Sequence, residues 1–220
     1  MEKIIIYGIG DFARLMHHYF TTESDFEVSA FCVDQKYKKD NMLYGLPIIS
    51  YEEIEKLYSA KKYSMFVAVG YSNMRVRKSL FDKAKSKGYK LVNFISRSSS
   101  LNSNIIFGEN NVFFQNVCVE PFVVIGDNNI FWSSAVICHD ATVGSHNFIA
   151  AGAIIGGFSK IEDLCFLGFR STVIQNLTLS NETLLGANSL LLDDTSLSSL
   201  WLGSPAKLKG LHSAEGIKIK

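Results

Sequence analysis

The sequence of 220 residues predicts a small α/β domain followed by a parallel β-helix of about five coils. Strand-like and helix-like segments alternate up to residue 94, whereas from residue 95 an apolar side chain recurs every six positions. Charge follows the same division, with 15 basic and 11 acidic residues in 1–94 but only 3 basic and 7 acidic ones in 95–191. We therefore expect an α/β domain at 1–94, a β-helix at 95–192 and a tail at 193–220.

The first 94 residues alternate between buried strands and amphipathic helices, which is typical of a small parallel sheet, half of a Rossmann-like domain. In chain order we expect a strand at Lys3–Tyr7, a helix at Arg14–Phe20, strands at Phe26–Val33 and Ser64–Val69 with a short helix at Tyr51–Leu57 between them, a helix at Arg75–Ser86 and a last strand at Lys90–Phe94.

A glycine motif follows the first of these strands. Gly8, Gly10 and Ala13 have the GxGxxA spacing, and Asp34 ends the next strand. Glycine lets a ligand approach the backbone, and the N–H groups at a helix start can bind phosphate. The same residues also suit a plain tight turn in the sheet. Because only about 90 residues are present, half a dinucleotide site that holds one nucleotide is more plausible than a complete one.

The hexapeptide repeat is the strongest signal in the sequence. Seventeen positions, six residues apart and without one insertion, all hold Ile, Leu, Val or Phe: 95, 101, 107, 113, 119, 125, 131, 137, 143, 149, 155, 161, 167, 173, 179, 185 and 191. Chance would give this in a fixed register about once in 10⁸ trials, if such residues make up roughly a third of a chain. One inward apolar residue, a corner pair and a small inward residue form the repeat unit of a parallel β-helix.

Three hexapeptides make one triangular coil, so residues 18 apart stack at about 4.8 Å. Corner side chains point away from the core, which makes a corner histidine a candidate for chemistry. His139-Asp140 is such a corner pair, and Gly157-Phe158 lies one coil beyond it. His146 lies in a neighbouring corner column, where an ordinary corner role is expected, and His17-His18 suit surface or packing positions.

Composition excludes several classes of protein. A net charge of +1 gives no excess for binding a nucleic-acid backbone. No apolar run reaches the ~18–20 residues of a membrane span, and the start lacks a secretory leader, so we expect a cytoplasmic protein. Its 4 cysteines have no CxxC spacing and are expected to be reduced. A β-helix with a catalytic metal needs three histidine ligands, but 95–191 holds only His139 and His146, so no metal is expected.

In combination, several segments resemble one family over almost the whole chain. These segments are Ile6-Tyr7-Gly8-Ile9-Gly10, Val33-Asp34, Val67-Ala68-Val69-Gly70 followed by Asn73 and Arg75, His139-Asp140-Ala141-Thr142-Val143-Gly144, Ala150-Ala151-Gly152-Ala153, and Leu202-Gly203-Ser204-Pro205-Ala206-Lys207. The family is that of the sialic acid O-acetyltransferases and bacillosamine N-acetyltransferases, hexapeptide-repeat enzymes that include the perosamine and dTDP-4-amino-4,6-dideoxyglucose N-acetyltransferases. The resemblance implies a left-handed β-helix, whereas generic crossover rules alone would favour the right hand.

The resemblance also implies roles for residues. His139 would be the general base, aided by Asp140, in a homotrimer whose acetyl-CoA lies between neighbouring subunits. The backbone N–H of Gly157 would bind the thioester carbonyl, with further CoA contacts at Ala187 and Lys207. The nucleotide-linked amino sugar would contact the α/β domain at Gly8, Gly10, Asp11, Phe12, Asp34, Lys36 and Asn73.

Two positions depart from the family pattern. Many relatives carry a second histidine nine residues after the first, where this chain has Phe148, and their His-Pro near the start of the coils is Ser96-Arg97 here. The predicted activity is acetyl transfer from acetyl-CoA to the 4-amino group of a dTDP- or UDP-linked 4-amino-4,6-dideoxy sugar, for a surface polysaccharide or glycan. O-acetylation of sialic acid and a non-catalytic nucleotide-binding scaffold are the alternatives.

Overall fold

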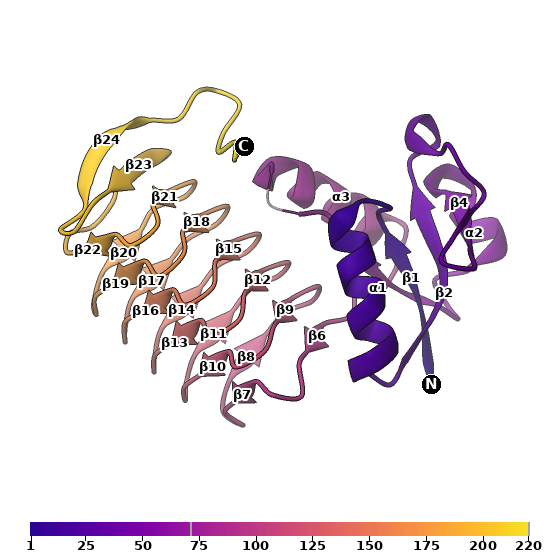
Figure 1. Ribbon diagram of the computed structural model, residues 1–220, viewed down its shortest axis with the longest axis horizontal. Coiled ribbons are helices and arrows are strands. Elements are labelled where there is room, and N and C mark those ends of the chain that lie inside the picture. The colour runs from indigo at the N-terminus through magenta and orange to yellow at the C-terminus, as the bar shows by residue number, and fades with distance from the viewer. Residues whose placement is uncertain (71, 220) are drawn as a thin grey trace. The chain divides into compact units, whose positions relative to one another are not determined.

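The computed structural model describes residues 1–70 and 72–219, which form two compact units. One unit comprises residues 1–70 and 77–94, and the other comprises residues 72–76 and 95–219 (Figure 1). Within the described residues, none of the helices is both long enough and apolar enough to span a bilayer.

The first unit is a five-stranded sheet in the order β3-β4-β2-β1-β5. Its strands are β1 (Glu2–Tyr7), β2 (Phe26–Val33), β3 (Met42–Leu43), β4 (Leu46–Ser50) and β5 (Ser64–Val67). Its helices are α1 (Asp11–Glu23), α2 (Ile54–Leu57) and α3 (Met74–Ser86), with short 3-10 turns at Gln35–Tyr37 and Tyr51–Glu53. Strands β4, β2, β1 and β5 are parallel, and β3 joins β4 as an antiparallel hairpin.

Each face of this sheet packs against helices. On one face, Phe20 of α1 contacts Phe66 edge-on, with ring centroids 5.0 Å apart. On the other, Phe81 and Ala84 of α3 are buried with Ile54 of α2 and the alternate residues of the strands. Burial of these apolar faces, at about 25 cal/mol per Å² of apolar surface, is what holds the layers together.

The predicted strands β1, β2 and β5 are confirmed, but one hairpin of this unit was missed and two expectations were wrong. The hairpin β3–β4 was not predicted, because Pro47 in β4 argues against a strand that is paired on both sides. Helix α1 begins at Asp11 rather than Arg14. Residues 90–93 form no strand, since only Leu91 makes a single bridge to Met65.

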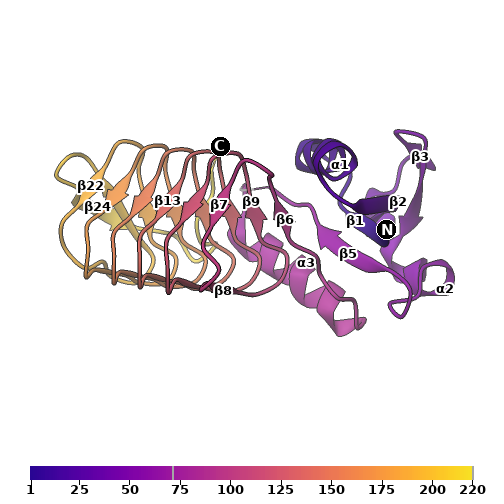
Figure 2. The ribbon, with the colours of Figure 1, turned by 90° about the horizontal axis from the view of Figure 1, so that it is seen from below.

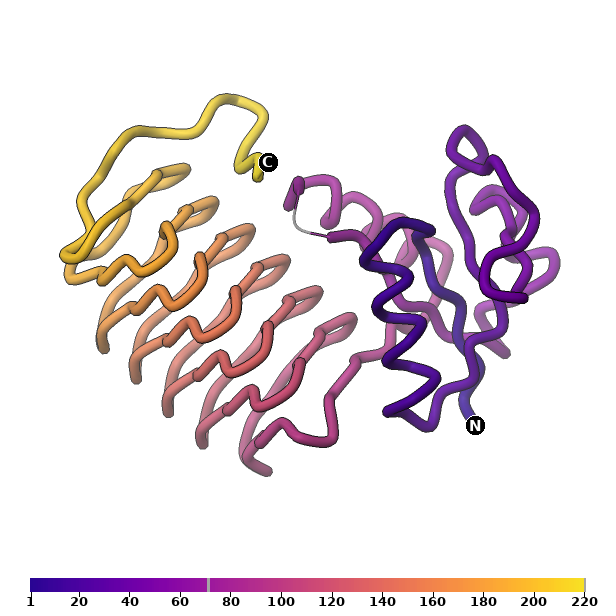
Figure 3. The backbone as a smooth tube through the Cα atoms, in the orientation of Figure 1, coloured from indigo at the N-terminus to yellow at the C-terminus, as the bar shows by residue number. Residues whose placement is uncertain are grey.

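The second unit is a β-helix, as predicted, whose coils consist of two-residue parallel strands in three sheets, with the longer β23 and the antiparallel β24 added to the third sheet (Figures 2 and 3). The first sheet holds β7 (Ser100–Leu101), β10 (Cys118–Val119), β13 (Val136–Ile137), β16 (Ile154–Ile155), β19 (Thr172–Val173) and β22 (Leu190–Leu191). The second holds β8 (Ile106–Phe107), β11 (Val124–Ile125), β14 (Thr142–Val143), β17 (Lys160–Ile161) and β20 (Thr178–Leu179). The third holds β6 (Phe94–Ile95), β9 (Val112–Phe113), β12 (Ile130–Phe131), β15 (Phe148–Ile149), β18 (Phe166–Leu167), β21 (Leu184–Leu185), β23 (Ser199–Leu202) and β24 (Lys207–Leu211).

Every ladder of the coils pairs residues that are 18 apart, such as Val136 with Ile154 and Thr142 with Lys160. From Leu101 onward the apolar residue of each hexapeptide packs into the core, and those from residue 113 onward are buried in it, whereas Ile95 at the start is exposed. Aromatic rings stack within it, as Phe113 and Phe131 do with centroids 4.9 Å apart and planes 6° apart. Each hexapeptide therefore contributes one inward apolar residue to one side of the triangular coil.

The corners share one backbone conformation. From residue 110 to residue 188, every sixth residue has a positive φ, and only the one at Gly152 is a glycine. The N–H of such a residue donates to a corner carbonyl of the previous coil, as that of Asp140 does to Pro121 O at 3.1 Å. The left-handed conformation costs a non-glycine residue roughly 1 kcal/mol. This hydrogen bond offsets that cost at the corners from Asn128 onward.

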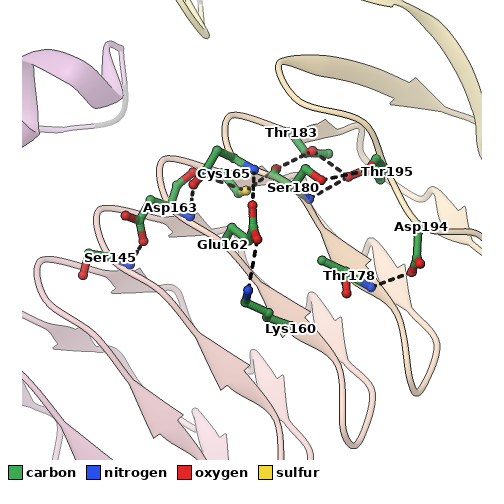
Figure 4. Close-up of polar contacts among 11 residues, drawn as sticks. Ser145, Lys160, Glu162, Asp163, Cys165, Thr178, Ser180, Thr183, Asp194 and Thr195 are labelled. Atoms are coloured by element: carbon green, nitrogen blue, oxygen red, sulfur yellow. Dashed lines mark hydrogen bonds and ion pairs between the residues drawn. The ribbon is translucent and has the colours of Figure 1, made fainter.

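Side chains form a second set of ladders at the corner between the second and third sheets. On the inner side of this corner, the side chain of Asn129 accepts the N–H of Asn147 at 2.9 Å and donates to Gly144 O at 2.9 Å. Outside it, Asp163 Oδ1 accepts the N–H of Ser145 at 2.7 Å (Figure 4). The glycine that precedes these corner pairs at 108, 126 and 144 leaves room for the ladder side chain of the next coil.

Replacing Asn129 with alanine is expected to lower the free energy of unfolding by about 2–4 kcal/mol, because it leaves two buried backbone groups without a partner. The side chain is fully buried, so water cannot replace its bonds. Urea denaturation followed by circular dichroism measures the loss. Asn104, exposed on the first coil, is the matched control, and its alanine variant should stay within about 0.5 kcal/mol of the parent. Equal stability of both variants would contradict the ladder's role.

The tail packs on the last coils and on residues 72–76. Arg75 donates from Nη2 to Glu182 Oε2 at 2.7 Å and from Nη1 to the carbonyl of Ala214 at 2.6 Å. Strand β23 continues the third sheet beside β21, and β24 pairs antiparallel with β23. The end of the β-helix core is thereby covered, with Ala206 buried against it.

Candidate active site

His139 and Asp140 form the corner between β13 and β14. His139 Nδ1 lies 3.0 Å from Asp140 Oδ2, and the two side chains are 52% and 38% exposed. Because a carboxylate oxygen accepts hydrogen bonds, this contact favours the neutral tautomer in which Nδ1 carries the proton and Nε2 has the lone pair. The pair therefore presents a basic nitrogen at the surface of the coil, held in one tautomer by its neighbour.

Gly157 lies directly beside this imidazole, so the stacking predicted from the 18-residue coil is confirmed. The N–H of Phe158 donates to His139 O at 3.2 Å. A Cβ atom added at Gly157 would lie 3.1 Å from His139 Cε1 and 3.2 Å from Nε2. Within residues 1–70 and 72–219, the N–H of Gly157 has no hydrogen-bond acceptor. A donor next to the basic nitrogen is the arrangement that acyl transfer needs.

Two exposed phenylalanines flank the pair, one coil before and one coil after. Phe122 and Phe158 have φ of 66° and 60° and are 60% and 58% exposed. The ring of Phe158 meets the imidazole edge-on, with centroids 5.2 Å apart and planes 87° apart. The sequence placed Phe158 one coil beyond the pair, as found, but it missed Phe122, whose spacing of 18 from Asp140 could have revealed it.

Phe148 does not point at the site. Its side chain is buried on the outer side of the third sheet and stacks on Phe166, with centroids 5.1 Å apart. His146 is also buried, and its Nδ1 lies 2.9 Å from Asn128 Nδ2 in the corner ladder. The expectation that His146 is an ordinary corner residue agrees with this position, and Phe148 supplies no polar donor.

The glycine motif of the first unit contains two kinds of position. A Cβ at Gly8 would lie 2.5 Å from Ala68 O, and φ there is 139°, so this glycine is needed for the packing of β1 beside β5. Gly10 precedes α1 and has open space around it. Asp11 and Phe12 start α1, where the Asp11 carboxylate is exposed and lies 3.9 Å from Arg14.

Asp34 ends β2 and is held by two side chains that sequence reasoning did not foresee. Lys83 of α3 donates to Oδ2 at 2.8 Å, and the Tyr7 hydroxyl donates to Oδ1. Burial alone would raise the pKa of Asp34, but these hydrogen bonds outweigh it and hold the pKa below its usual range. Lys36 is exposed nearby, with Nζ 4.7 Å from the centre of the Tyr37 ring. The carboxylate is thus ionised and oriented, with Lys83 as a further cation.

The remaining predicted contacts lie on other elements. Asn73 Oδ1 accepts the N–H of Val76 at 3.1 Å and so caps the first turn of α3. Ala187 is exposed at a corner between the third and first sheets, a different corner column from that of His139. Lys207 is exposed at the start of β24. Among the described residues of the β-helix, therefore, His139, Asp140 and Gly157 are brought together at one corner.

The fold, an α/β domain followed by a β-helix of hexapeptide coils, is one that solved sugar N-acetyltransferases share. Residues 3–84 match the PglD N-terminal domain family. The chain is 27% identical to PerB from Caulobacter crescentus, solved with CoA and GDP-perosamine, with a TM-score of 0.82 over 96% of this chain and 98% of that one. It is thus homologous to the sugar N-acetyltransferases, and the predicted resemblance is confirmed.

Two further solved proteins share the fold. The acetyltransferase domain of PglB from Neisseria gonorrhoeae, solved with acetyl coenzyme A, is 21% identical with a TM-score of 0.80, over 94% of this chain and 99% of that one. WeeI from Acinetobacter baumannii is 21% identical with a TM-score of 0.79, over 95% of this chain and 100% of that one.

Proposed function

We propose that the protein transfers an acetyl group from acetyl-CoA to the 4-amino group of a dTDP- or UDP-linked 4-amino-4,6-dideoxy sugar. The observation that carries the proposal is the basic Nε2 of His139 beside the N–H of Gly157, which has no acceptor among the described residues. The product would be an amide built into a surface polysaccharide or glycan.

The proposed reaction is a direct transfer. His139 Nε2 takes a proton from the sugar amine as the amine nitrogen attacks the thioester carbonyl. The N–H of Gly157 donates to the oxygen of the tetrahedral intermediate. The carbon–sulfur bond then breaks, and the proton passes from His139 to the CoA thiolate. Asp140 stabilises the imidazolium between these two steps through Nδ1.

PerB supports a nucleotide-linked amino sugar as the class of substrate, whereas the dTDP or UDP part of the proposal rests on the resemblance stated from the sequence. PerB was solved with GDP-perosamine, a nucleotide-linked amino sugar, and histidine-to-alanine and histidine-to-asparagine variants of the perosamine enzyme have been solved with the same ligands. For this chain, Gly10 with its open surroundings and the oriented Asp34 support a nucleotide site on the first unit, with Lys36, Asp11 and Phe12 around it.

We further propose that the active form is a homotrimer, with Ala187 and Lys207 contacting the CoA. Exposed apolar side chains on the outside of the coils support self-association. Ile106 and Val124 are 68% and 44% exposed and pair across β8 and β11. Adjacent exposed apolar residues of this kind mark interaction surfaces. Sedimentation equilibrium tests the proposal, and a monomer at all concentrations would oppose it.

Thiol release from acetyl-CoA tests the activity. The acceptors are dTDP-, UDP- and GDP-linked 4-amino-4,6-dideoxy sugars, with sialic acid as the substrate of the competing O-acetyltransferase function. Release that requires a nucleotide-linked amino sugar, with an amide product seen by mass spectrometry, supports the proposal. Release with sialic acid alone favours O-acetylation. Nucleotide-sugar binding without any release favours a non-catalytic scaffold.

A further inference from the structure

The backbone N–H groups at the corners follow a rule that explains how His139 is held. At the corner between the second and third sheets, the first residue of each pair donates its N–H to a side chain 18 residues later. Ser145 donates to Asp163 Oδ1 at 2.7 Å, and Asp163 donates to Asn181 Oδ1 at 2.8 Å. The acceptor in these cases comes from the next coil.

The pattern ends at the last pair of this corner. Asn181 lies on the last coil, and its N–H donates instead to Glu162 Oε2 at 3.0 Å, from 19 residues earlier. His139 belongs to another corner, between the first and second sheets, and the residue 18 later is Gly157, which has no side chain to accept its N–H. Its N–H donates to Glu120 Oε2 at 2.8 Å, again from 19 residues earlier. A glutamate thus replaces the missing acceptor in both places.

The absence of a side chain at position 157 is itself required by the site. A Cβ there would lie 3.1 Å from the imidazole and would crowd the face at which acyl transfer is proposed. The corner therefore cannot have both an open imidazole and the usual acceptor from the next coil. Glu120 resolves the conflict from the previous coil, on the side away from Gly157.

We infer that Glu120 is a positioning residue for His139. Glu120 accepts the N–H of His139, and the adjacent Pro121 carbonyl accepts the N–H of Asp140 at 3.1 Å. The dipeptide Glu120-Pro121 thus fixes both amide groups of the catalytic pair. Loss of the Glu120 bond frees the peptide before His139, so the imidazole leaves its place beside Gly157. A misplacement of about 1 Å can cost about 10²-fold in rate.

Three substitutions at Glu120 separate geometry from charge. Glu120→Gln keeps an oxygen acceptor of the same length, Glu120→Asp keeps the charge but shortens the reach, and Glu120→Ala removes the acceptor. Glu162→Ala is the matched control, since Glu162 makes the same contact to Asn181. If Glu120 positions His139, the alanine and aspartate variants lose about 10- to 100-fold in kcat, with KM for both substrates within about threefold of the wild type. Glu120→Gln and Glu162→Ala keep the wild-type kcat.

The inference rests on the proposed function for its kinetic arm, so a second readout works without a substrate. The protein has 5 histidines, and ¹⁵N-histidine NMR resolves their rings, with His139 assigned from His139→Ala. In Glu120→Ala and Glu120→Asp, the His139 ring signals should shift or broaden while the other four stay in place and report an intact fold. Unchanged His139 signals in both, or an equal change in Glu162→Ala, would overturn the inference. An inactive wild type would end only the proposed function.

Discussion

Replacing His139 with alanine is expected to lower kcat for acetyl transfer by about 10²- to 10⁴-fold, the usual contribution of a positioned general base. The imidazole is the proposed base because Asp140 holds Nδ1 and leaves Nε2 unbonded among the described residues. Without it, the ammonium formed on attack loses the proton acceptor that lies beside Gly157. Thiol release under saturating acetyl-CoA measures the change.

The stability of the His139 variant should be unchanged. The side chain is 52% exposed and its backbone bonds persist in alanine, so the midpoint of urea unfolding should match that of the parent. His18→Ala, on the exposed side of α1, is the control substitution and should keep full activity. A His139→Ala protein that retains more than about a tenth of the parent's kcat would rule out the assigned role.

Replacing Gly157 with alanine is expected to lower kcat by about 10²-fold through crowding alone. The added methyl would lie 3.1 Å from His139 Cε1 and 3.2 Å from Nε2, closer than ordinary van der Waals contact. Because φ at Gly157 is not positive, alanine can adopt the backbone conformation there. The imidazole must therefore turn away from the N–H that is proposed to bind the thioester oxygen.

Gly210 provides the matched comparison for this substitution. It lies in β24, and a Cβ atom there would meet nothing within 4 Å. Gly210→Ala should therefore leave kcat and the free energy of unfolding unchanged, whereas Gly157→Ala should lower kcat and leave unfolding largely unaffected. If both variants keep at least half of the parent's kcat, the space beside the imidazole is not needed for the reaction.

The β-helix could be predicted closely because one rule fixes it. An inward apolar residue every six positions determines the three sheets and the 18-residue register, and the register places Gly157 beside His139 without further information. The same pattern carries no record of the contact between Glu120 and His139. That bond spans 19 residues and depends on an absent side chain at position 157, so no periodicity indicates it.

The α/β unit was less predictable because its site depends on tertiary packing. Asp34 was identified from its place at a strand end, but its partners are Tyr7 on a neighbouring strand and Lys83 on a helix 49 residues later. Short elements were also not predicted from the sequence, such as the β3–β4 hairpin that contains Pro47. The fold of this unit was therefore foreseen in outline, and the electrostatics of its strand ends were not.

The 18-residue register limits how this molecule can change in length. Each strand of the inner coils is held by partners one coil before and one coil after it, and the corner ladders keep the same step. Because side chains alternate between the two faces of a strand, inserting one residue within a coil would turn every following apolar residue outward. Inserting a whole coil would leave every pairing intact. The chain can thus lengthen in units of 18 residues, and relatives that differ by one coil would keep the same three faces.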